Sequence, residues 1–133
     1  PWIPSRLGEE RTGMTSYPWR DLIESGAIIG NGTDVPVEPI SAIASYYSSV
    51  SRMTIKDKKF HPEHVMTRME ALQSYTINNA YAAFEEDIKG SLTPGKLADI
   101  VVLSQDILEI EEDQIPSTEV LYTILGGEIK YQK

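Results

Sequence analysis

The pattern of apolar residues changes once along this chain. Up to about Glu86, apolar side chains recur at steps of three and four residues, as they do on one face of an α-helix. Beyond Glu86, β-branched and apolar residues form continuous runs over Ala98 to Leu103 and Val120 to Leu125, which is typical of strands. The change of period predicts an α/β protein in which a β region follows a mainly helical one.

Three segments are expected to be helical. They are a short helix that ends near Ser25 before Gly26, a helix from Pro39 to about Arg52, and a long helix from Thr67 toward Phe84. Thr67 and Glu70 have the spacing of a capping box, in which each side chain accepts a backbone N–H of the other residue. This motif makes the third helix the clearest of the set.

The remaining segments are predicted as strands or loops. Pro1 to Gly13 mixes proline, glycine and charge without a period, so it is expected to be a loop, as is the polar segment Lys56 to Lys59. Ala27 to Asn31 has the profile of a short buried strand. Two glycines, Gly126 and Gly127, separate Val120 to Leu125 from Glu128 to Tyr131, which indicates a hairpin.

Composition excludes several classes of protein. The net charge of −8 would repel a phosphate backbone, so no nucleic-acid partner is expected. No apolar run approaches the roughly 20 residues that a membrane span needs. Cysteine is absent, which rules out disulfides and thiolate metal sites and fits a reducing compartment; we expect a cytoplasmic location. The first methionine is Met14, so the chain is expected to be a piece of a longer protein.

Asp34 is the leading candidate for chemistry. It follows the expected strand Ala27 to Asn31, lies among small residues, and precedes two prolines that would stiffen its loop. Ligands of α/β folds bind at the carboxyl ends of strands, so Asp34 could hold a metal or contact a substrate. An aspartate at such a junction also commonly caps the next turn or helix, and spacing alone favours the cap.

Four further side chains are candidates with competing interpretations. His61 and His64 are three residues apart and could form a metal pair, although a polar surface helix entry is the favoured interpretation. Arg6 and Arg11 precede the Asp34 segment by one helix and could hold an anionic group of a substrate. Ion pairing at the surface with Glu9 or Glu10 is the alternative for at least one of them.

Five stretches together resemble amidohydrolase family 3. They are Arg6 to Arg11, Gly30 to Val37, Glu70 to Ala80, Gly90 to Asp99, and Gly126-Gly127. The Gly-Ser-Leu-x-x-Gly-Lys-x-Ala-Asp stretch is specific to the superfamily, and Thr-Asp-x-Pro-Val points to this branch. Thr33 stands where the family usually has serine, which leaves the carboxylate of Asp34 in place. The resemblance covers nearly the whole chain and implies the carboxy-terminal third of such an enzyme.

The resemblance implies a fold and an activity. Residues 1–86 would be the last part of a (β/α)8 barrel, and residues 87–133 would be strands of a small β-sandwich. Asp34 would be the metal-associated aspartate, binding a divalent metal, zinc by expectation, and moving a proton during hydrolysis of a C–N bond in a small amide-type substrate. Asp99 would be structural and would brace the β tail against the helix that ends in Asn78 and Asn79.

The resemblance also implies that most of the active site lies elsewhere. A barrel needs about 250 residues, so the other metal ligands would be in upstream sequence. One carboxylate cannot hold a catalytic metal, and the chain alone is therefore expected to be inactive. The alternative is a folding or association module without catalysis. Uncovered strand edges lead us to expect a homo-oligomer in either case.

Overall fold

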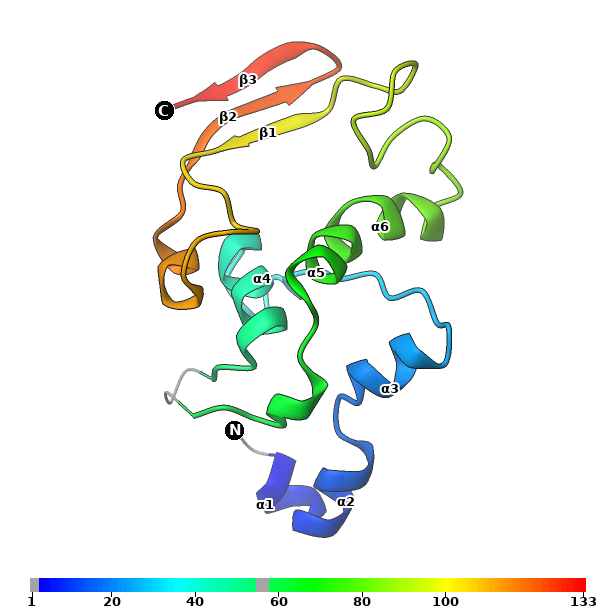
Figure 1. Ribbon diagram of the computed structural model, residues 1–133, viewed down its shortest axis with the longest axis vertical. Helices are drawn as coiled ribbons and strands as arrows, with labels where there is room; N and C mark the ends of the chain where they lie inside the picture. Colours follow the sequence, from blue (N-terminus) through cyan, green and yellow to red (C-terminus); the bar gives the residue numbers. More distant parts are fainter. Residues whose placement is uncertain (1–2, 55–57) are drawn as a thin grey trace.

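The computed structural model describes residues 3–54 and 58–133. Its helices lie at one end and through the middle of the molecule, and its small sheet forms the other end (Figure 1). In chain order the elements are α1 (Ile3–Leu7), α2 (Glu9–Thr15), α3 (Trp19–Glu24), α4 (Ala42–Ser51), the 3-10 helix η1 (Pro62–His64), α5 (Arg68–Tyr75), α6 (Ile77–Ala82), β1 (Ile100–Leu103), the 3-10 helix η2 (Glu112–Ser117), β2 (Val120–Leu125) and β3 (Glu128–Gln132). The chain is therefore an α/β protein, as expected.

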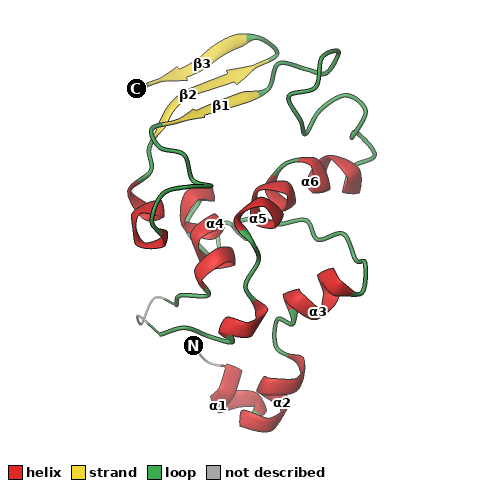
Figure 2. Ribbon diagram, viewed as in Figure 1, coloured by secondary structure: helices red, strands yellow, loops and turns green. Residues whose placement is uncertain are grey.

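The sheet has three antiparallel strands in the order β1-β2-β3 (Figure 2). Leu125 pairs with Glu128 at the end of the β2–β3 hairpin, so Gly126 and Gly127 form its two-residue turn as predicted. Both glycines have positive φ, 58° and 84°, which glycine adopts without steric cost. Asp99 supports this turn, because its Oδ1 accepts a hydrogen bond of 2.8 Å from the Gly126 amide.

Asp99 is structural, as expected, but the group that it binds is the hairpin turn and not the helix with Asn78 and Asn79. Those two asparagines bind the carbonyls of Ile29 and Asn31.

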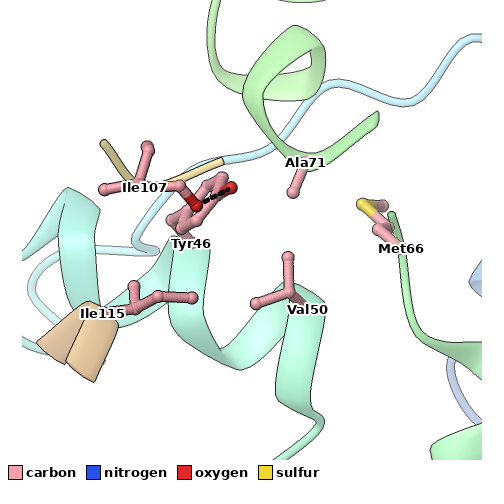
Figure 3. Packing of buried hydrophobic residues seen from close by; sticks show 6 residues of the cluster. All are labelled: Tyr46, Val50, Met66, Ala71, Ile107 and Ile115. Carbon is pink, nitrogen blue, oxygen red and sulfur yellow. Dashed lines mark hydrogen bonds between the residues drawn. The ribbon is translucent and has the colours of Figure 1, made fainter. Parts of the chain in front are cut away.

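The core lies where α4 packs against α5 and η2. Six buried apolar residues form it, and Figure 3 shows their side chains converging: Tyr46, Val50, Met66, Ala71, Ile107 and Ile115. Tyr46 reaches across the core, and its hydroxyl donates to the carbonyl oxygens of Arg68 (3.2 Å) and Ile107 (3.3 Å). Because these contacts join residues far apart in sequence, they hold the β region to the helical region.

Two helices start at the caps that their sequences provide. Thr67 and Glu70 form the predicted capping box, with the Glu70 amide donating to Thr67 Oγ1 at 3.2 Å and the Thr67 amide to Glu70 Oε2 at 2.7 Å. Ser41 caps α4 by accepting from the Ala44 amide. The expected start of that helix at Pro39 was wrong, because the cap at Ser41 places the first turn at Ala42.

Three other expectations were wrong. Beyond residues 1 and 2, which lie outside the described residues, the expected loop Pro1 to Gly13 instead forms α1 and α2. The long helix divides at Thr76, which leaves helical geometry at φ −122° and ψ −97° and returns its hydroxyl to the Leu72 carbonyl. Ala27 to Asn31 belongs to no helix or strand among the described residues, and Ile28 is exposed.

The polar segment Lys56 to Lys59 is described only in part. Residues 55–57 lie outside the described residues, while Lys59 forms an isolated antiparallel bridge with Met53. Across the ranges that are described, no helix combines the length and apolar character required to cross a bilayer.

An ion pair between Arg20 and Glu70 joins α3 to α5. The guanidinium donates twice to the carboxylate, with N–O distances of 2.9 and 2.7 Å, and once to the Val65 carbonyl at 2.8 Å. The Arg20 hydrogen bonds lower the pKa of Glu70 to about 2; partial burial opposes this shift, and the Thr67 hydrogen bonds add to it. Two hydrogen bonds between a planar guanidinium and a carboxylate are stronger than hydrogen bonds between neutral groups.

This pair is expected to make stability fall in acid. Because the folded-state pKa of Glu70 lies below its ordinary value of 4.5, the stabilisation is complete above about pH 4.5 and is lost as the pH falls toward 2. The free energy of unfolding of Glu70→Gln should lie about 2 kcal/mol below that of the unaltered chain at pH 7 and approach it near pH 2. Urea denaturation at a series of pH values measures this difference.

The matched control removes an exposed pair. Glu112→Gln breaks the 3.3 Å ion pair with Lys59, which lies at the surface, and should change stability by less than about 0.5 kcal/mol. If the difference in the free energy of unfolding between Glu70→Gln and the unaltered chain stayed the same down to pH 2, the Arg20–Glu70 pair would not be the source of the acid sensitivity.

Candidate functional site

The segment before Asp34 is held by two asparagines of α6. Asn78 donates from Nδ2 to the Ile29 carbonyl at 2.9 Å, and Asn79 donates from Nδ2 to the Asn31 carbonyl at 2.8 Å. The Asn31 amide donates to the Ser74 carbonyl at 3.0 Å. Helix side chains and a helix carbonyl thus bind the backbone groups that a neighbouring strand would otherwise pair.

Gly30 allows this close approach. A Cβ atom at this position would lie 2.4 Å from Asn79 Oδ1, which is closer than such atoms come in proteins. A side chain at this position would therefore displace the Asn79 amide group, which donates to the Asn31 carbonyl. Packing against this side chain, and not a positive φ, favours glycine here.

A second set of hydrogen bonds joins the same segment to α4 and α5. Asn31 Nδ2 donates to Ser49 Oγ at 2.7 Å, while Asn31 Oδ1 accepts from the Gly32 amide at 2.9 Å. Ser45 Oγ donates to the Gly32 carbonyl at 3.2 Å and accepts from the Tyr75 hydroxyl. Burial raises the pKa of Tyr75, so the hydroxyl stays protonated and able to donate at neutral pH.

Asp34 follows this clamped segment in a left-handed backbone conformation. Its φ is 57°, which aspartate tolerates better than most residues, and its carbonyl accepts from the amides of Val37 (2.8 Å) and Glu38 (3.3 Å). The side chain is exposed, and no described residue donates a hydrogen bond to its carboxylate. The interpretation of Asp34 as a side-chain cap of the next turn or helix was wrong, because no described amide donates to its carboxylate and Ser41 caps α4.

The two arginines lie in the first helices of the chain. Arg6 is in the last turn of α1, and Arg11 donates from Nε to the Leu7 carbonyl at 2.8 Å. Both are exposed, and Figure 1 shows α1 and α2 at the end of the molecule remote from the sheet. Their role in binding a substrate stays a prediction.

The two histidines are largely buried, with 18% of the His61 side chain and 12% of the His64 side chain exposed. They lie in and beside η1, with ring centroids 6.0 Å apart. His61 Nδ1 is 2.8 Å from Glu63 Oε1, and His64 Nδ1 is 3.9 Å from Asp21 Oδ1. The described part of the chain contains no group of three or more histidine, cysteine, aspartate or glutamate side chains placed to hold a metal. The favoured interpretation, a polar surface helix entry, was right about the helix entry and wrong about the surface, because both imidazoles are mostly buried.

Asp34 fits a metal as one ligand of several. Its carboxylate oxygens are donors of the type that divalent cations accept, and no described side chain competes for them. Because the described residues form no metal cluster, the other ligands would have to come from elsewhere.

Residues that support Asp34 were not identified from the sequence. Asn31, Ser45 and Tyr75 act through contacts between distant parts of the chain, which periodicity does not reveal. The Asn78-Asn79 pair stood within a stretch that resembled a known family, which is the one signal that could have drawn attention to it.

Comparison with known proteins gives a consistent assignment. A model of the amidohydrolase family matches residues 1–131. The chain is 36% identical over 130 residues to the protein LONG AFTER FAR-RED 3 of Arabidopsis thaliana, covering 97% of this chain and 22% of that protein. It is 28% identical over 126 residues to the N-substituted formamide deformylase of Arthrobacter pascens, covering 95% of this chain and 23% of that enzyme.

Solved structures agree with this result. An uncharacterized metal-dependent hydrolase from Pyrococcus horikoshii OT3 has a TM-score of 0.72 and 32% identity, with 84% of this chain and 23% of that chain covered. The chain thus spans about a quarter of the length of the proteins that it matches. A match over almost every residue shows that this chain belongs to amidohydrolase family 3.

Proposed function

We propose that this chain is the carboxy-terminal part of a metal-dependent amidohydrolase that hydrolyses C–N bonds of small amide-type molecules. Residues 1–86 would complete a (β/α)8 barrel, and residues 87–133 would belong to a small β-sandwich. Family membership supports hydrolysis, and one relative is named for removing formyl groups from N-substituted formamides. The partial coverage of these relatives supports the assignment to a part of the enzyme.

The exposed carboxylate of Asp34 is the observation that carries this proposal. A left-handed aspartate, presented by a segment that α4, α5 and α6 hold, keeps its carboxylate free of hydrogen bonds from described residues. Backbone conformations of this kind are often retained where function requires them. A purely structural aspartate would be expected to bind a backbone amide or a cation nearby.

Asp34 would act as ligand and proton carrier. A divalent metal, zinc in this proposal, supplies Lewis-acid activation of water when bound. Asp34 accepts a proton from the attacking water at one carboxylate oxygen and then donates it to the nitrogen of the leaving amine. The clamp of Asn79, Ser45 and Tyr75 fixes the segment from which the carboxylate projects.

A second candidate is a folding or association module without catalysis. Large apolar side chains are unusually exposed, with Phe84 at 93%, Ile40 at 80% and Leu92 at 78% of their full accessibility. Such surfaces in a soluble protein commonly contact another polypeptide. The partner would be the rest of the barrel or a second copy of the chain, and we expect a homo-oligomer.

The full-length protein that contains this chain tests both candidates. Incubated with N-substituted formamides in water enriched in oxygen-18, it is expected to release the amine and to place one labelled oxygen in formate. Elemental analysis is expected to find a divalent metal in the same preparation. A metal-free oligomer that releases no amine from formamides or related amides would refute the hydrolase and favour the association module.

A further inference from the structure

The serines of α4 use their hydroxyl groups in two different ways. Ser48, Ser49 and Ser51 each donate to the carbonyl oxygen four residues earlier in the same helix, at 3.1, 3.0 and 2.7 Å. This local bond is common for a serine within a helix. Ser45 instead donates out of the helix, to the Gly32 carbonyl at 3.2 Å. A contact from outside α4 must therefore direct this hydroxyl.

The hydroxyl of Tyr75 provides that contact. Tyr75 ends α5, and its hydroxyl is hydrogen-bonded to Ser45 Oγ. A carbonyl oxygen can only accept, so the Ser45 proton points to Gly32, and the proton between the two side chains comes from Tyr75. Burial raises the pKa of Tyr75, so this donor is present at neutral pH. The hydrogen bonds form a relay that runs from Tyr75 through Ser45 to Gly32.

The relay ends two residues before Asp34. Asn31 Oδ1 accepts from the Gly32 amide at 2.9 Å, while Ser45 donates to the Gly32 carbonyl. Asn79 donates to the carbonyl of Asn31 at 2.8 Å. Both peptide groups that flank Gly32 are thus held by side chains. Because glycine permits a wide range of backbone conformations, the direction in which the chain enters Asp34 depends on these bonds.

We propose that Tyr75 is a positioning residue for Asp34, acting through Ser45 and the Gly32 carbonyl. Its hydroxyl keeps Ser45 turned toward Gly32 and away from the carbonyl of Ser41, which lies four residues earlier in the chain. The carboxylate is then presented in one direction. This inference rests on the proposed role of Asp34, and it makes turnover depend on a hydroxyl group of α5 that lies outside the segment presenting the carboxylate.

Tyr75→Phe in the full-length protein removes the hydroxyl and keeps the ring. Ser45 can then bond within its own helix, as Ser48 does, and the Gly32 carbonyl loses its donor. With a formamide substrate, kcat should fall about tenfold while KM stays within about twofold, because a displaced carboxylate weakens transition-state stabilisation more than substrate binding. A kcat within twofold of the unaltered enzyme would overturn the proposal.

The matched control is Tyr46→Phe. This substitution also removes a buried tyrosine hydroxyl, but one that donates to carbonyls in the core. It should lower the urea midpoint and leave kcat within about twofold. An equal loss of kcat in Tyr46→Phe and Tyr75→Phe would show that the effect comes from general loosening of the fold, which would overturn the positioning role.

A double-mutant cycle tests the connection between Tyr75 and Ser45. Ser45→Ala removes the middle of the relay, so adding Tyr75→Phe to it should cause no further loss of kcat. Ser45→Thr keeps a hydroxyl and should retain most of the turnover that Ser45→Ala loses. If the losses of the two single variants multiply in the double variant, the residues act independently and the relay is refuted.

Two measurements distinguish a failure of this inference from a failure of the proposed function. Hydrogen exchange of the segment 30–38, followed by mass spectrometry, should be about fivefold faster in Tyr75→Phe whether or not the enzyme turns over. Asp34→Asn, assayed alongside, reports on the proposed function. If Asp34→Asn loses turnover and Tyr75→Phe does not, only the positioning role is refuted. If Asp34→Asn keeps turnover, the proposed function fails; faster exchange in Tyr75→Phe then still supports the relay, and unchanged exchange overturns it.

Discussion

Asp34→Asn in the full-length enzyme is expected to lower the rate of amide hydrolysis by about 10³-fold or more while the protein remains folded. Asparagine matches the size of aspartate and tolerates the left-handed conformation at φ 57°, so the turn should be kept. It cannot accept the proton of the attacking water, and it is a weaker ligand for a divalent cation. Steady-state kinetics with a formamide substrate measure the loss, and the urea midpoint reports the fold.

An exposed aspartate outside the site serves as the control for Asp34. Asp87→Asn removes the same charge from a surface position after α6 and should leave kcat and kcat/KM within about twofold. An Asp34→Asn enzyme that hydrolyses its substrate at the unaltered rate would refute the proposed role of this carboxylate.

Gly90→Ala is expected to produce the largest loss of stability, about 2–5 kcal/mol in the free energy of unfolding. Gly90 has φ at 88°, which costs a residue with a Cβ atom about 1–2 kcal/mol. The added methyl would also lie 2.8 Å from Ala80 Cβ and 2.9 Å from Ile77 Cα. Relief of that clash requires movement of α6, which adds an overpacking cost of about 1–3 kcal/mol.

Gly95→Ala separates these two causes. Gly95 has φ at 97°, yet nothing lies within 4 Å of the position that its Cβ would occupy. Only the backbone cost should remain, so this variant should lose about 1–2 kcal/mol. Urea denaturation of the two variants under the same conditions measures the difference. Equal losses would show that the contact with α6 is not the source of the larger effect.

The elements that were predicted correctly depend on neighbours in sequence. The hairpin of β2 and β3 follows from two adjacent glycines between apolar runs, and the capping box of α5 follows from Thr67 and Glu70 three residues apart. The helix predicted to end near Ser25, before Gly26, was also correct: α3 ends at Glu24. In each case the hydrogen bonds that define the element join residues a few positions apart.

The elements that were predicted wrongly depend on contacts between distant parts of the chain or on the length of a helix. Ala27 to Asn31 has the composition of a buried strand, but a strand requires a partner and no described residue provides one; α6 binds the carbonyls of Ile29 and Asn31. The break at Thr76 turns α6 so that Asn78 and Asn79 reach this segment. Composition at the start of the chain suggested a loop because glycine and proline disrupt long helices, although two short helices accommodate them.

The sequence by itself determined the class of fold, the capping box of α5, the hairpin turn and the family, through motifs that are read along the chain. It could not decide whether Asp34 is a cap or a free carboxylate, because both interpretations use the same residues at the same spacing. Tertiary structure decided this question. Ser41 caps the next helix, and residues 13 to 49 positions away from their bonding partners hold the segment that presents Asp34. Contacts over such distances depend on how the helices pack, and packing does not follow from local periodicity.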